Sequence, residues 1–127
     1  MPTAFPTKPI LNIAYDQSLM DSRERILTFA GYTVESVHLR PDALKHLLAG
    51  KYSLVLIGHS VPAVERDELI VLFRASDRSV PIVFVASSTE PESCASADMT
   101  IGSRPDALLK GVSDATRESQ PLGTARV

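Results

Sequence analysis

Side chains that could carry out acid–base or nucleophilic chemistry follow three separate apolar runs of this sequence. Asp16 comes after the first run, His59 and Ser60 come after the second, and Ser87 comes after the third. An acid, a base and a hydroxyl nucleophile are the components of a hydrolase site. The sequence has no G-x-S-x-G motif, however, and signals no pair of oxyanion donors. We therefore predict that the chain is not an enzyme, and keep a hydrolase on Asp16, His59 and Ser87 as the weakest alternative.

The other residues able to bind a metal or to react are too few or too isolated. Asp16 offers one carboxylate, which suits a turn or a helix cap better than a cation site. Neither His38 nor His46 forms a metal-ligand spacing with His59, which is expected to be a partly exposed residue at a strand end. Cys94 is the single cysteine and has no charged neighbour that would activate its thiolate. We predict no metal, no cofactor and no internal disulfide.

Short strands must position these residues. Residues 54–57 form an unbroken apolar run that is too short for a helix, which is typical of a strand buried on both faces of a parallel sheet. The other predicted strands are residues 10–15 and 81–87, which are also apolar in their middles, and residues 33–38 and 99–102, which are more mixed and belong at the sheet edges.

Helical segments with one apolar face separate these strands. Ser18 is the predicted N-cap of the first helix, and Gly31 is well placed to end it. Residues 91–97 are too polar and small for more than a short helix. The arginines within the helices are expected on solvated faces. The predicted helices cover residues 19–29, 40–49, 64–75 and 105–116, and the arginines are Arg23, Arg25, Arg66 and Arg74.

This alternation predicts a single doubly wound α/β domain. Five strands and about five helices should form a flavodoxin-like parallel sheet of order 2-1-3-4-5. The expected domain covers residues 10–117, with a lead-in at 1–9 and a disordered tail at 118–127. Ligands of such sheets bind at the carboxyl ends of the strands, so the candidate residues would share one edge.

Composition excludes several classes of protein. The 127 residues carry a formal net charge of -2, which gives no electrostatic reason to bind nucleic acid or an anionic membrane. The first nine residues have no apolar core of the kind found in a signal peptide, and no run is long enough to cross a bilayer. We predict a cytoplasmic protein, as its single cysteine also suggests.

Several pieces of the chain match a known family in their order and spacing. They are ILNIAYDQS at 10–18, AGYTV at 30–34, DAL at 42–44, LVLIGHSVP at 54–62, VPIVFVAS at 80–87 and RP at 104–105. From about Pro9 to Ala115 the chain resembles the receiver domain of bacterial response regulators. The resemblance implies the flavodoxin-like fold and a place in two-component signal transduction or a phosphorelay.

The resemblance also implies where phosphorylation chemistry would stand. Receivers hold magnesium with two adjacent carboxylates, accept the phosphoryl group on an aspartate, and bind it with a hydroxyl and a lysine. Here the acidic pair falls on Ala14 and Tyr15, and the acceptor falls on Gly58. The hydroxyl falls on Ala86, and the lysine on or near Arg104. Alanine and tyrosine are poor ligands for magnesium and glycine has no nucleophile, so the chain should be a pseudo-receiver.

We therefore predict a stand-alone module that acts by phosphorylation-independent protein–protein interaction. Its partner, or a second copy of the chain, would contact residues 88–117. A second hypothesis is a sensor of a small molecule or anion at the sheet edge, where Gly58 and Ala86 leave room. A weaker third is residual phosphotransfer. The residues available to a ligand at that edge are Asp16, His59, Ser60, Ser87 and Arg104.

Overall fold

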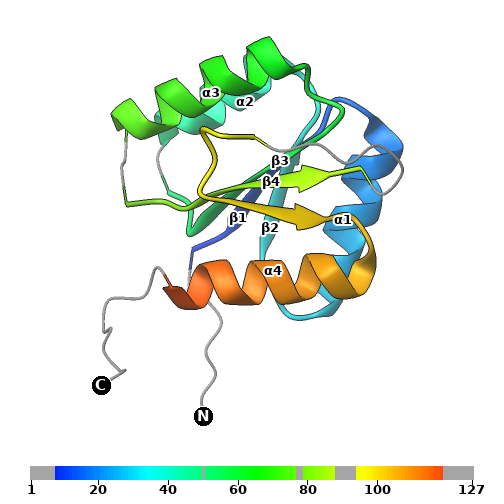
Figure 1. Ribbon diagram of the computed structural model, residues 1–127. Coiled ribbons are helices and arrows are strands. Elements are labelled where there is room, and N and C mark those ends of the chain that lie inside the picture. Colours follow the sequence, from blue (N-terminus) through cyan, green and yellow to red (C-terminus); the bar gives the residue numbers. More distant parts are fainter. Residues whose placement is uncertain (1–7, 50, 77–78, 88–93, 119–127) are drawn as a thin grey trace.

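A five-stranded parallel sheet lies at the centre of the computed structural model, which describes residues 8–49, 51–76, 79–87 and 94–118. The sheet has the predicted order β2-β1-β3-β4-β5, with the two mixed strands at its edges (Figure 1). Every residue of β1, β3 and β4 is buried, as their apolar sequences predict. The strands are β1 (Ile10–Ile13), β2 (Val34–Val37), β3 (Leu54–Gly58), β4 (Ile82–Ala86) and β5 (Met99–Gly102).

Two layers of helices cover the sheet. In the described parts of the chain, α2 and α3 lie over one face and α1 and α4 over the other (Figure 1). Alternate residues of the central strands accordingly fall into two separate hydrophobic clusters, one under each layer. No helix among the described residues is long and apolar enough to cross a membrane. The helices are α1 (Gln17–Phe29), α2 (Arg40–Ala49), α3 (Ala63–Ser76) and α4 (Pro105–Glu118).

The predictions for the chain's less regular segments have mixed outcomes. Of the short helix considered at 91–97, residues 94–97 are not helical, with turn and bend at 95–97, and residues 91–93 lie outside the described residues. Residues 1–7 of the lead-in and 119–127 of the tail also lie outside them. Residue 118, assigned to the tail from sequence, is the last residue of α4.

The ends of α1 confirm two predictions, Asp16 as a helix cap and Gly31 at the end of the helix, and contradict one, Ser18 as the N-cap. Its N-cap is Asp16, whose Oδ1 accepts a hydrogen bond from the Leu19 N–H at 3.1 Å. The prediction of Ser18 as N-cap was wrong, because Asp16 is equally suited to the role and stands two residues earlier, where the strand has just ended. At the other end Gly31 follows the C-cap with φ of 110°, a left-handed conformation that favours glycine, and this prediction is confirmed.

Two arginines expected in solvent are buried. Arg66 of α3 is 4% exposed and donates from Nη2 to the Val61 carbonyl at 3.1 Å. Its Cζ lies over the Phe84 ring, 4.2 Å from the ring centroid. Arg23 of α1 is 3% exposed. Both lie on the inward stripe of their helix, and a long side chain there can carry its charge to the end of the sheet. The prediction that these two were solvated is therefore wrong.

Gly111 lets α4 approach β5 closely. A Cβ at this position would overlap the side chain of Ile101, which is β-branched and stiff. We predict that Gly111→Ala lowers the free energy of unfolding by about 1–3 kcal/mol, although alanine favours the helix by about 1 kcal/mol. Urea unfolding of the wild type and variant measures this. In the Ile101→Ala background the same substitution should cost less, and a wild-type-like or greater stability of the single variant would contradict the close packing.

Candidate functional site

The sequence-predicted residues do lie at the carboxyl edge of the sheet. Asp16 follows β1, His59 and Ser60 follow β3, and Ser87 follows β4, the three strands being adjacent and parallel. His59 and Ser87 are half-buried, and the His59 N–H donates to the Val85 carbonyl at 3.0 Å, which extends the ladder between the two strands. The topology thus brings these residues to one end of the molecule.

Ser60 connects the turn after β3 to the turn after β1 by hydrogen bonds. Its Oγ accepts hydrogen bonds from the backbone N–H groups of Tyr15 at 2.9 Å and Asp16 at 3.1 Å. Asp16 places its carboxylate on the Leu19 N–H, and this is the only hydrogen bond that the carboxylate accepts from the described residues. Asp16, the acid in the hydrolase hypothesis, therefore caps α1 and does not orient His59.

The space beside Gly58 is filled by Arg23. Gly58 is buried at the end of β3, and a Cβ built on it would overlap Nη1 of Arg23 and lie 3.3 Å from its Cζ. The same Cβ would be 3.6 Å from the Ile13 carbonyl oxygen. The expectation that Gly58 leaves room for a ligand is therefore corrected: a side chain from α1 uses that room.

The guanidinium of Arg23 is a buried cation with unused donors. Nη1 and Nη2 are both inaccessible to solvent and have no hydrogen-bond partner among the described residues. Burial lowers the pKa of Arg23, while the negative charge of Asp16 raises it. Burying a charge without a bonded partner costs free energy, so this residue stands out from an ordinary core.

Comparison with known proteins identifies the architecture. No protein-family model and no curated protein matches this chain. Among solved structures, a CheY-like receiver domain protein from Methanospirillum hungatei is 23% identical, with a TM-score of 0.76 over 90% of this chain and 97% of that one. CheY4 from Vibrio cholerae is 19% identical, with a TM-score of 0.74 over 87% and 99%.

The fold is the CheY-like receiver fold. The response regulator TrrA from Thermotoga maritima, solved with Mg²⁺ and BeF, has it too, at 17% identity and a TM-score of 0.71 over 90% of this chain and 100% of that one. Identities this low establish the fold, and the chemistry of the edge must be judged from the residues of this chain.

The residues that the resemblance assigns to the receiver's metal position do not fit magnesium. Ala14, directly after β1, is fully buried and has no oxygen on its side chain. Tyr15 donates its hydroxyl to Glu65 Oε1 on α3 at 2.7 Å. Magnesium takes hard oxygen ligands in octahedral geometry, which these side chains and the Arg23 cation cannot supply. Within the described ranges no three His, Cys, Asp or Glu residues group closely enough to hold a metal ion.

The other two residues that the resemblance assigns to the phosphorylation site, Ala86 and Arg104, have little means to bind a phosphoryl group. Ala86, at the end of β4, is 8% exposed and has no hydroxyl. Arg104, just after β5, points into solvent with its side chain 79% exposed and its Nε 4.0 Å from Asp106 Oδ1. Exposed pairs of this kind contribute little free energy. The hypothesis of an anion held by Arg104 therefore gains no support from its surroundings.

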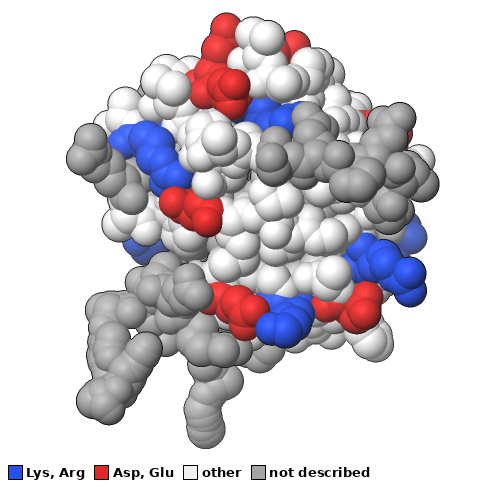
Figure 2. Space-filling view, in the orientation of Figure 1, with Lys and Arg blue, Asp and Glu red and all other residues white. Residues whose placement is uncertain are grey.

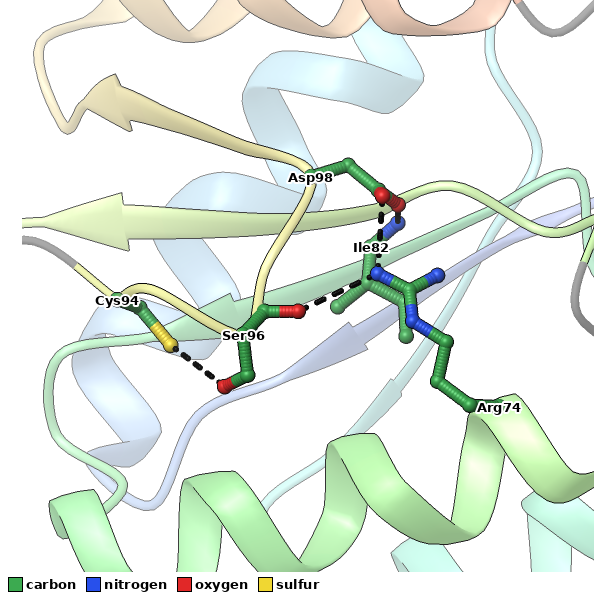
Figure 3. A network of polar contacts seen from close by, with 5 residues as sticks. All are labelled: Arg74, Ile82, Cys94, Ser96 and Asp98. Carbon is green, nitrogen blue, oxygen red and sulfur yellow. Dashed lines mark hydrogen bonds and ion pairs between the residues drawn. The ribbon is translucent and has the colours of Figure 1, made fainter.

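A polar network fixes the segment before β5 (Figure 3). Asp98 accepts the Ile82 N–H at 2.7 Å with one carboxylate oxygen and pairs with Arg74 of α3 at 2.9 Å with the other. Arg74 also donates to the Ser96 carbonyl at 3.3 Å, and the Ser96 hydroxyl lies 3.5 Å from the sulfur of buried Cys94. These contacts bind the approach to β5 onto α3, on the face of the sheet opposite α4.

Replacing Gly58 tests the placement of Arg23. We predict that Gly58→Asp is more stable than Gly58→Asn by about 1–3 kcal/mol, since only the carboxylate gives the buried guanidinium a charged partner, while the two side chains are equal in size. Denaturant unfolding at neutral pH measures the difference. In an Arg23→Met background the order should reverse, because an aspartate would then be buried without a cation. Equal stability of the two Gly58 variants would show that Arg23 lies elsewhere.

Proposed function

We propose that this chain is a receiver-like signalling module that works without phosphorylation, by binding another protein. The receiver fold supports a role in signal transduction, of the response-regulator kind. The observation that carries the rest of the proposal is Arg23, which occupies the space at Gly58, where the resemblance places the phosphoacceptor.

The chemistry of the edge supports a loss of phosphorylation. Phosphoryl transfer needs a nucleophile and a metal ion to neutralise the charge that develops on the transferred group. Gly58 supplies no nucleophile, and neither Ala14 nor Tyr15 supplies a carboxylate. The Arg23 guanidinium would also repel a divalent cation placed beside it in this poorly solvated region.

The face around β5 supports protein binding. Figure 2 shows that uncharged side chains fill the middle of this face, and that charged ones lie above and below it. We call the uncharged residues around the start of β5, Ala95, Ala97, Met99 and Thr100, the uncharged band. Ala95 and Thr100 are exposed, and the one charged residue among them, Asp98, is paired with Arg74. Charged residues are depleted in the centres of protein interfaces, so we place the partner here, within residues 88–117.

Acetyl phosphate tests the loss of phosphorylation. After incubation of the purified protein with acetyl phosphate and Mg²⁺, we expect an intact mass without an added phosphoryl group, because no side chain at Gly58 can accept one. A receiver that keeps its acidic residues, treated in parallel, should gain the group and shows that the reagent works. A stoichiometric mass gain in this chain would overturn the proposal.

A charge in the uncharged band tests the contact. We predict that Thr100→Lys reduces recovery of a partner about tenfold or more in affinity capture from the native cells, since the lysine would be desolvated at the interface. Val71→Lys, on the exposed side of α3, is the matched control and should leave recovery unchanged. Loss of the partner with Val71→Lys alone would move the contact to α3. Recovery of only the protein itself would replace the partner by a homodimer.

A further inference from the structure

Arg23 has buried hydrogen-bond donors that could bind a ligand, because no described residue accepts from them. Its two terminal nitrogens carry four N–H donors, and neither nitrogen has an acceptor among the described residues. The whole residue is 3% exposed. Because a buried ion without hydrogen bonds is costly, an arrangement that gives this guanidinium an acceptor should be more stable than the one in the unliganded chain.

The surroundings of Arg23 include a second unused donor. Ser60 accepts two backbone N–H groups with its oxygen, while its own hydroxyl hydrogen has no acceptor in the described parts of the chain. Ser60 accepts the N–H of Asp16, the N-cap of α1, and it follows closely after Gly58, where a Cβ would overlap Arg23 Nη1. Both donors therefore lie at the carboxyl edge, beside the turns that follow β1 and β3. The carboxylate of Asp16 is itself engaged with the Leu19 N–H.

We propose that Arg23 is the centre of a binding site for a small inorganic oxyanion of the phosphate class, with Ser60 as its second donor. The planar fork of a guanidinium matches two oxygens of such an ion, and the bond is strong where water is excluded. No described residue supplies an acceptor to Nη1 or Nη2, and we assign that role to an anion from solution. The flexible end of the Arg23 side chain can turn away from Gly58 to meet it, since no hydrogen bond from Nη1 or Nη2 holds it there.

This site differs from an anion site on Arg104. Both arginines stand at the carboxyl edge, but Arg104 is exposed and paired with Asp106, whereas Arg23 is buried and its terminal nitrogens are unpaired within the described residues. The two residues therefore give a matched pair of variants for one experiment. The proposal goes beyond partner binding, and can fail or succeed whether or not a partner is found.

Thermal unfolding of the full chain in phosphate tests the site. Sodium phosphate is compared with sodium chloride at equal ionic strength and pH. At ten times the dissociation constant, we expect phosphate to raise the Tm of the wild type by about 4 °C. Arg104→Gln should keep this rise and Arg23→Gln should lose it. An equal rise in both variants would reflect a general salt effect and overturn the proposal, as would loss of the rise in Arg104→Gln alone.

If Arg23→Gln does not fold, a second variant and a measurement on the wild type still test the site. Arg23→Lys keeps a positive charge but loses the planar fork, and should lose most of the Tm rise. With the folded wild type, the ³¹P resonance of inorganic phosphate should broaden, and sulfate should compete for the site. An unbroadened resonance across a millimolar phosphate titration would overturn the proposal without reference to any variant.

Discussion

Burial of the three central strands on both faces is the constraint on which the rest of the structure depends. A helix layer must cover each side of β1, β3 and β4, and the described turns after β1 and β3 lie at the carboxyl end of the sheet. At the carboxyl edge the turns that follow β1 and β3 therefore lie next to each other, close to the helices that cover the sheet. A polar side chain that enters there leaves water, and its charge has large effects on its neighbours.

Arg23 and Gly58 illustrate that constraint together. The volume that a side chain at Gly58 would use is taken by a guanidinium from α1, so each residue restricts what the other can be. The resemblance assigns the receiver's acidic acceptor to Gly58, and in this chain a buried cation lies against that residue. A buried charge thus stands at the carboxyl edge of a sheet that has the receiver fold.

Much of the fold could be predicted because its signals are local. Unbroken apolar runs predict the central strands, and mixed runs predict the edges. The same reasoning brought the candidate residues to the correct end of the sheet, since all strands are parallel. It failed for Arg23, although the i, i+3, i+7 spacing of Met20, Arg23 and Leu27 on the buried side of α1 was available as a signal. That its guanidinium reaches Gly58, a residue from another strand, depends on packing that no local pattern contains.

The contacts of Asp98 have a consequence for how this protein can evolve. Its carboxylate accepts the N–H of Ile82, and its own N–H donates to the Ile82 carbonyl at 2.8 Å. The chain therefore leaves the start of β4 and returns to the same point before it enters β5. Lengthening the segment between Ile82 and Asp98 costs little additional loop-closure entropy, because that cost grows slowly with length. The two hydrogen bonds between these residues would still hold the register of β5. An insertion between β4 and β5 could therefore add a new recognition surface with little loss of folding free energy.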